Sequence, residues 1–478
     1  MRKLVALACM SALAACTTVG PNYERPKGAI VNHDSAKAPF VGSKNPAFVP
    51  DEVPGDWWRL YRDPVLDGLI EDALKANTDL RVAAANIEKS RAGLDAADSA
   101  RDPTTTVGAA PLLLQQRSAE EELKGKHPLP ASWAYGATFG VSYQVDLFGQ
   151  IRRSIESANA DVASAQAAYD AVRVTVVAET TRAYLESCSA GREIAVTRQL
   201  AETQERSRAY TQRLEQGGRA VSLDVRRAST QEDQVLASLP ALQARKELAV
   251  FRLATLTGRT PQEFSSPAQA CVQEPRLEKP IPVGDGAALL QRRPDIRRAE
   301  SDLRASTARI GVAVAELYPK VSLGASVGSV GLVKDSFESG TRKFSLGPLI
   351  SWQFPNRSVT HARIRAAQAD EAAAYAKFDG AVLVALRETE SALVVYAQDI
   401  DARNYLESAR KKSAQSASDT QRLFAAGRSG YLPVLDAMRT QIATEQAVAA
   451  ADSKLAADQV AVFLALGGGW QSARPLPQ

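Results

Sequence analysis

The sequence of 478 residues is poor in aromatic residues, histidine and cysteine, and it has no large excess of charge of either sign. Only 6% of its residues are aromatic, and 58 Lys and Arg face 54 Asp and Glu, so the composition predicts neither a nucleic-acid groove nor a polybasic membrane patch. Beyond the N-terminus, no uncharged apolar run reaches the roughly 18 residues that a membrane-spanning helix needs. If the chain crosses a bilayer, it must therefore do so as β-structure.

Motifs of enzymes and metal sites are also missing. The three histidines, His33, His127 and His361, show no metal-ligand spacing, and there is no phosphate-binding loop, GxSxG turn or paired-cysteine motif. Cys188 falls within an expected helix, where a small packed residue is a simpler interpretation than a nucleophile. We therefore expect no enzymatic activity, no metal and no dissociable cofactor.

The N-terminus has the pattern of an export signal. Two basic residues precede a short apolar stretch, so residues 1–15 are predicted to be a signal peptide. The text Leu13-Ala14-Ala15-Cys16 resembles a bacterial lipobox, which implies that Cys16 receives a diacylglyceryl thioether, becomes the first residue after cleavage and is N-acylated. An ordinary signal peptide with an incidental cysteine is the alternative. Because Thr17 follows where an Asp would favour the inner membrane, the resemblance implies sorting to the outer membrane.

Export leaves two cysteines in an oxidising compartment. Cys9 is removed with the signal peptide and Cys16 is acylated, so Cys188 and Cys271 remain. A disulfide and two free thiols are both compatible with the sequence, because the separation of the two residues in space is not given by it.

The mature chain consists of two similar halves. Each half has a helical pattern ended by a proline, two strand-like runs, a turn and a very long helical stretch that reverses at a second turn. The predicted divisions are a signal peptide (1–15), an anchored N-terminal and equatorial segment (16–78), a first repeat (79–258), a Pro-rich equatorial linker (259–288), a second repeat (289–468) and a tail (469–478).

Strands of bilayer length are expected at about 103–148 and about 319–355. Three of the four runs alternate between apolar and small polar residues, which is the pattern of a strand with one face in lipid. Each run has about ten residues, enough for a tilted strand to cross a bilayer. The run near 104–114 alternates poorly. A half-buried sheet in a soluble domain would give the same alternation.

The long helical stretches are expected within about 149–258 and about 356–468. Their first rods lack proline over residues 151–215 and 359–426, and each would measure about 100 Å as one helix. Apolar or small residues recur at alternating steps of four and three, which is typical of coiled-coil packing. The seams are Ile151, Ile155, Ala158, Val162, Ala165, Tyr169, Val172 and Val176, and Ala362, Ala366, Ala369, Ala373, Ala376, Gly380 and Leu383.

Each rod is predicted to reverse at a glycine turn and to return as a helix. Gly218 and Gly427 are placed where a helix C-cap needs a positive φ. Ser222 suits an N-cap and Pro433 suits a first helical position.

Four strands cannot close a barrel, and an open sheet edge is not viable in lipid. The sequence therefore predicts an oligomer, and three copies with twelve strands are the simplest solution that leaves an interior wide enough for solutes. The predicted fold class is an α+β membrane protein with four transmembrane strands and long coiled-coil helices per chain, assembled as a trimeric β-barrel on an α-helical barrel.

The text LQRRPDIRRAE at 290–300, with IGVA at 310–313 and AELYP at 315–319, resembles the signature of the NodT-type outer-membrane factors, which are lipoproteins similar to TolC and OprM. The resemblance covers essentially the whole mature chain. It implies the outer-membrane channel of a tripartite efflux pump that exports drugs or other toxic compounds, working with a periplasmic adaptor and an inner-membrane transporter of the resistance-nodulation-division type. Further text fits the pattern: GPNY at 20–23, Pro26, Trp57-Trp58, Asp63-Pro64, Leu66, Leu69, VDLFG at 145–149 and YLPVLDAMR at 431–439.

The resemblance also implies functional residues at the two hairpin turns. In the family, side chains near the second turn constrict the channel, which assigns Leu432 to an apolar ring and Asp436 with Arg439 to an ionic lock. The spacing places all three on one helix face, where threefold symmetry would form rings. An ordinary exposed helix pair is the alternative. The tips at Gly218-Arg219 and Gly427-Arg428 are expected to contact the adaptor, or else to be plain hairpin caps.

The sequence is also compatible with two other functions. One is an exit duct for type I protein secretion, and the other is a structural envelope lipoprotein without a pore. The sequence predicts no nucleic-acid partner, and it indicates neither the exported substrates nor the particular adaptor and transporter.

Overall fold

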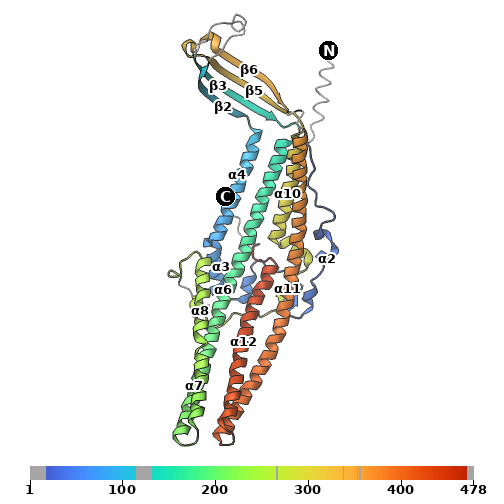
Figure 1. Ribbon diagram of the computed structural model, residues 1–478. Coiled ribbons are helices and arrows are strands. Elements are labelled where there is room, and N and C mark those ends of the chain that lie inside the picture. The colour runs from blue at the N-terminus through green and yellow to red at the C-terminus, as the bar shows by residue number, and fades with distance from the viewer. Residues whose placement is uncertain are drawn as a thin grey trace. The chain divides into compact units, whose positions relative to one another are not determined.

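The computed structural model describes residues 18–114, 132–264, 267–336, 338–352, 354 and 357–470 (Figure 1). The predicted signal peptide, Cys16 and His127 lie outside these residues. The chain divides into two compact units, which are described separately. The first contains residues up to Arg25, Ile87–Ser164 and Ala299–Phe378, and the second contains Pro26–Asn86, Ala165–Arg298 and the residues from Asp379 onward.

The first unit contains one antiparallel sheet in the order β2-β3-β5-β6. The edge strand β2 forms despite its poor alternation, and its Pro111 is tolerated because an edge strand leaves one row of N–H groups unpaired. Two inner strands are longer than the ten residues predicted. The bounds are β2 Thr104–Leu114, β3 Ser132–Val145, β5 Lys320–Leu332 and β6 Arg342–Ser351.

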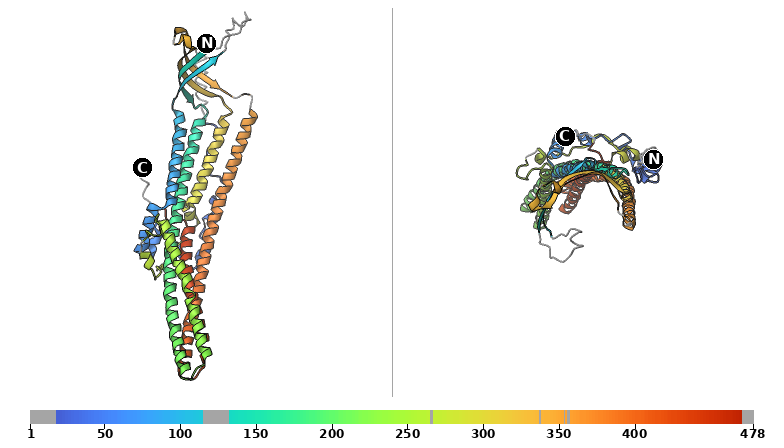
Figure 2. Two further views of the ribbon diagram at one scale, coloured as in Figure 1. Left: turned by 60° about the vertical axis from the view of Figure 1, so that its left-hand side comes forward. Right: turned by 90° about the horizontal axis from the view of Figure 1, so that it is seen from above.

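The register of the sheet separates its two faces by polarity. Val107, Phe139, Val327 and Phe344 lie opposite one another in one row across all four strands, and each is exposed. The next row along contains Thr106, Gly140, Ser326 and Ser345, and the last two hydroxyls are 2.8 Å apart. Within the described part of the chain both outer strands lack a further partner, and the sheet is curved in the view from above (Figure 2).

Long helices occur where the sequence predicts rods. Helix α6 has 67 residues and α11 has 69. In the first unit α6 starts at a turn in which Asp146 accepts hydrogen bonds from the backbone N–H groups of Ile151 (3.1 Å) and Arg152 (2.9 Å), and Gly149 has a φ of +79°. The bounds are α4 Thr78–Asp98, α6 Gln150–Gln216, α10 Pro294–Ala315 and α11 Arg357–Ala425.

The two returning helices differ, and this corrects the prediction of one helix in each hairpin. The second return is the continuous helix α12 (Tyr431–Ala465). The first return is broken into α7 (Ser222–Leu236) and α8 (Leu239–Leu256). Pro240 is the second residue of α8, and since proline cannot donate the hydrogen bond that would continue the helix, the ladder is interrupted there.

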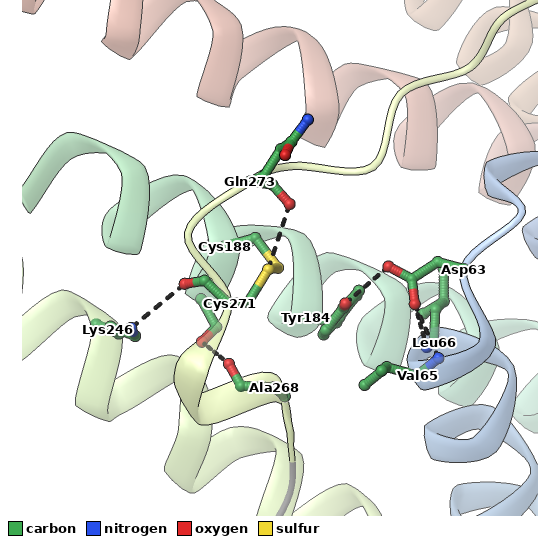
Figure 3. Close-up of a disulfide and its surroundings, with 10 residues drawn as sticks. Asp63, Val65, Leu66, Tyr184, Cys188, Lys246, Ala268, Cys271 and Gln273 are labelled. Carbon is green, nitrogen blue, oxygen red and sulfur yellow. Dashed lines mark hydrogen bonds between the residues drawn. A yellow bond between two sulfur atoms is a disulfide. The ribbon is translucent and has the colours of Figure 1, made fainter. Parts of the chain in front are cut away.

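The core of the second unit joins the N-terminal segment to the helices. Trp57 stacks on Phe463 of α12, with ring centroids 4.5 Å apart. Asp63 caps α3 by accepting from the N–H of Val65 (2.8 Å), and its other oxygen accepts from Tyr184 of α6 (2.8 Å), as Figure 3 shows. The remaining elements are α2 Asp34–Lys37, α3 Pro64–Ala76, α9 Gly286–Arg292 and the parallel pair of β1 Phe48–Val49 with β4 Ile281–Pro282.

The two remaining cysteines are joined. Cys188 of α6 and Cys271 of the Pro-rich linker form a disulfide with their Cα atoms 4.7 Å apart (Figure 3). This settles the choice that the sequence leaves open.

Candidate functional site

Both hairpin turns in the second unit have the same backbone structure. Gly218 and Gly427 have φ values of +70° and +69°. The N–H of Arg219 donates to the carbonyl of Leu214 (2.7 Å), and the N–H of Arg428 donates to that of Leu423 (2.9 Å). These bonds make each turn a Schellman motif, which needs a residue that tolerates positive φ. The predicted glycine caps are therefore confirmed.

The starts of the returning helices differ from the prediction. Val221 occupies the N-cap position of α7 and makes no side-chain capping bond, while Ser222 is the first helical residue. Gly430 is the N-cap of α12, so Pro433 is the third helical residue rather than the first. Proline is still tolerated there, because the first N–H groups of a helix have no partner within it.

The first turns of α12 have one buried face and one exposed face. Tyr431, Val434, Leu435 and Met438 pack with Ala228 of α7 in a small apolar core. Leu432 lies on the opposite face and is 57% exposed. Asp436 and Arg439 are exposed on the same face as Leu432. The three residues predicted to form the gate thus share one exposed helix face.

Within one chain, Asp436 and Arg439 do not pair with each other. The Nε of Arg439 donates to the Oε1 of Gln231 on α7 at 2.8 Å, and Gln231 is buried. Among the residues that the structure describes, none forms an ion pair with Asp436. The ionic lock therefore stays a prediction. Within one chain, the Asp436 carboxylate is available to pair with a group from outside that chain.

The arginines at the tips are exposed. In the described part of the chain, the side chains of Arg219 and Arg428 have no hydrogen-bonding or ionic partner. A Cβ placed on Gly218 or Gly427 would meet no atom within 4 Å. Open space around both turns suits a docking surface, but it suits a solvated cap equally, so the adaptor role of all four residues stays a prediction.

The RRPD text has a structural role that sequence reasoning missed. The Nε of Arg292 donates to the carbonyl of Leu466 (2.7 Å), and Arg293 donates to the carbonyl of Ala465 (2.9 Å). The two arginines thereby cap the C-terminal end of α12, where unpaired carbonyls carry partial negative charge. Arg293 also binds Asp295 and Glu388, at 2.7 Å and 2.8 Å.

The first repeat uses an uncharged version of the same cap. The Nδ2 of Asn77 donates to the carbonyl of Leu256 at the end of α8 (3.1 Å), and its Oδ1 caps the start of α4 through the N–H of Asp79 (2.9 Å). Both helices end at a glycine with positive φ, Gly258 and Gly467. Both returning helices end on similar text, LTG at 256–258 and LGG at 466–468, and this similarity was the sequence signal that could have predicted the cap.

A pair of carboxyl groups joins α11 and α12 in the second unit. Lys454 donates to Asp399 at 2.8 Å, and Asp399 also shares a hydrogen bond with Asp458. Burial, together with the neighbouring Asp399, raises the pKa of Asp458 to about 7. Since two carboxylates in contact repel and the hydrogen bond from Lys454 lowers the pKa of Asp399, protonation of the pair is favoured at Asp458.

The described residues contain no group of three or more His, Cys, Asp or Glu side chains that could hold a metal ion. None of their helices combines the length and the apolar character that crossing a membrane requires.

The family model described as "Outer membrane efflux protein" matches residues 69–259 and 287–468. The chain belongs to the outer membrane efflux protein family. It is 26% identical to "Nodulation protein T" of Rhizobium leguminosarum bv. viciae over 471 residues, covering 98% of this chain and 93% of that one. It is 30% identical to "Outer membrane protein OprJ" of Pseudomonas aeruginosa over 469 residues, covering 97% and 95%.

Among solved structures, the chain is similar to the outer-membrane channel OprN. The TM-score is 0.86 at 34% identity, with 95% of this chain and 100% of that chain covered. The resemblance to NodT-type proteins is therefore confirmed. The predicted function as an outer-membrane efflux channel and the predicted outer-membrane location are confirmed with it.

Proposed function

We propose that three copies of this chain form a lipid-anchored duct that exports small molecules across the periplasm and the outer membrane. The observation that carries the proposal is the open sheet with one exposed apolar face. Val107 and Phe344 lie on its two edge strands, and among the described residues each edge strand pairs on one side only. In lipid those groups need partners, and a second copy supplies them when β2 of one chain pairs with β6 of the next.

The helices support the same assembly. In the predicted seam of α6, Ile151, Ile155 and Val176 are buried and the other five residues are half-buried. The alanines of the α11 seam, from Ala362 to Ala376, are exposed instead. On α8, Leu248 and Phe251 are also exposed, one helical turn apart. Small residues and apolar side chains that the described part of the chain leaves exposed are what helices of neighbouring copies would cover.

The exposed face of Leu432, Asp436 and Arg439 is proposed as the periplasmic gate. Threefold symmetry turns each residue into a ring, and Asp436 of one copy is free to pair with a cation of the next. A ring of three carboxylates in a narrow pore is repulsive unless cations neutralise it, so this pairing would hold the pore closed. The exposure of Leu432 supports an apolar ring beside it.

The partners follow from the family and from the geometry of the tips. Gly218, Arg219, Gly427 and Arg428 are proposed to contact a periplasmic adaptor, with an inner-membrane transporter of the resistance-nodulation-division type behind it. Cys16 is proposed to carry the lipid because the text around it resembles a lipobox. The duct itself needs no chemistry, so no catalytic residue is assigned.

Native mass spectrometry in detergent and conductance in planar bilayers test the proposal together. A trimer that conducts ions is the expected result. Monomers alone would refute the assembly, and a trimer without conductance would favour a structural lipoprotein. A knockout that abolishes secretion of a protein but leaves drug sensitivity unchanged would favour the type I secretion duct instead.

A further inference from the structure

A single carboxylate on α12 collects arginines from three separate segments of the second unit. Asp452 is only 6% exposed. Its Oδ2 accepts from Arg192 of α6 (2.5 Å) and from Arg276 of the Pro-rich linker (3.2 Å), and its Oδ1 accepts from Arg403 of α11 (2.8 Å). Glu274, also from the linker, lies 3.5 Å from Arg192. We call these five side chains the Asp452 hub.

The hub is held by hydrogen bonds to charged groups. Burial alone would raise the pKa of Asp452, but the hydrogen bonds from Arg403 and Arg192 hold it below its ordinary value. The pKa of Glu274 is raised, mainly by burial. A carboxylate buried among three guanidinium groups is stable only while they stay in place, so the position of α12 depends on all three segments.

Of these segments, the linker is the least constrained. Residues 271–280 form no helix or strand, and the side chain of Arg276 is 60% exposed. An ion pair from so exposed a side chain contributes little by itself, because ordering it in water costs nearly as much as the contact gains. Something else must therefore hold the linker where Arg276 can reach Asp452.

The Cys188–Cys271 disulfide ties the linker to α6 (Figure 3), and Lys246 of α8 also donates a hydrogen bond to the carbonyl of Cys271 at 3.3 Å. Cys188 and Arg192 are four residues apart and so lie on one face of α6, and Cys271 precedes Glu274 by three residues. The covalent bond and the ionic contacts thus tie the same short stretch of linker to the same face of α6. The approach is close, because a Cβ on Gly191 would lie 2.1 Å from the carbonyl oxygen of Cys271.

We propose that Cys188–Cys271 is a redox-dependent clasp. Formed, it holds residues 271–276 on α6, brings Glu274 and Arg276 to the Asp452 hub and so fixes α12 against α6 and α11. It forms when two thiols transfer two electrons and two protons to a disulfide oxidant of the periplasm by thiol–disulfide exchange. Reduction by a dithiol reverses the step, releases the linker and loosens α12.

Hydrogen–deuterium exchange of the full-length protein in detergent, with and without dithiothreitol, tests the clasp without reference to channel activity. Reduction should speed exchange of the linker peptide 271–278 and of the α12 peptide 445–460, in each case by at least about threefold. Alkylation of both thiols, detected by mass spectrometry, verifies that reduction occurred. If the folded protein resists dithiothreitol, Cys271→Ser supplies the open state.

A double-mutant comparison shows whether the clasp acts through the hub. Arg276→Ala should speed exchange of the α12 peptide in the oxidised protein and should add nothing after reduction. The matched control is Arg259→Ala, which removes another linker ion pair, with Asp72 at 2.9 Å, and should leave α12 unchanged. The clasp is refuted if reduction speeds only the linker peptide, if it speeds neither peptide, or if Arg276→Ala and reduction have fully additive effects on α12.

Discussion

Removal of the Arg293 side chain should destabilise the second unit because it removes one of the two arginines that cap the end of α12. Arg293 is 10% exposed, and it binds the carbonyl of Ala465 together with Asp295 and Glu388. Those two carboxylates are about 40% exposed, so water can replace their ion pairs and little stability is lost with them. The buried carbonyl of Ala465 would keep only the longer hydrogen bond from the hydroxyl of Thr389, at 3.3 Å. A hydrogen bond from a charged donor to it contributes about 1.5–3 kcal/mol.

For Arg293→Ala we therefore expect a loss of about 2–4 kcal/mol, which includes some lost packing of the side chain. Arg293→Lys keeps the charge but lacks the planar guanidinium group that hydrogen-bonds to the carbonyl and to both carboxylates at once. Roughly half of that loss is therefore expected. Thermal unfolding in detergent, followed by far-ultraviolet circular dichroism, is the assay. Since about 1 kcal/mol shifts the midpoint by roughly 2–4 °C in domains of about 150–250 residues, a drop of several degrees should be seen for Ala.

Arg298→Ala is the matched control, because Arg298 belongs to the same RRPDIRR text but is exposed. Its midpoint should stay within about 1 °C of the wild type. If Arg293→Ala unfolds no earlier than Arg298→Ala, the capping explanation of this signature is wrong.

Three further predictions concern pH, the gate and the membrane. Burial, followed by Asp399, raises the pKa of Asp458 from its ordinary 3.8 to about 7, so the stabilisation from this shared proton is complete below the lower value and is lost as the pH rises through the higher one. Asp458→Asn should flatten that part of the stability profile, and an unchanged profile between the two values would contradict the shared proton. Asp436→Ala or Arg439→Ala should raise single-channel conductance in planar bilayers, whereas conductance equal to wild type would leave the proposed lock without support. Phe344→Asp should reduce recovery of the assembled protein from outer membranes, because it places a charge in the exposed apolar row; undiminished recovery would mean that this face does not meet lipid.

The long elements could be predicted because their patterns are periodic and repeated. The seam from Ile151 to Val176 and the proline-free rods locate α6 and α11, and the glycines at 218 and 427 locate the turns. Short-range detail was less accessible. The break after Leu236 depends on a single proline, and the strand β2 is defined by its pairing with β3 more than by its own alternation.

Contacts between distant parts of the sequence were beyond prediction. Nothing in the RRPD text indicates that Arg293 caps a helix that ends 172 residues later in the chain. The Asp452 hub could not be predicted for the same reason. It joins four segments, and the spacing of Arg192, Arg276 and Arg403 in the sequence has no period. Even the disulfide, whose two cysteines were the obvious pair, required the distance between them.

The unequal returning helices give the two hairpins different mechanical properties. Because α12 runs without interruption from Tyr431 to Ala465, it can act as a stiff lever that carries a small rotation at Asp452 over about 24 Å to Asp436. The interruption before Pro240 makes α7 and α8 a jointed arm that absorbs such a rotation. Force applied at the hairpin tips would therefore bend the first hairpin at its interruption, whereas α12 of the second hairpin would rotate as one rigid helix.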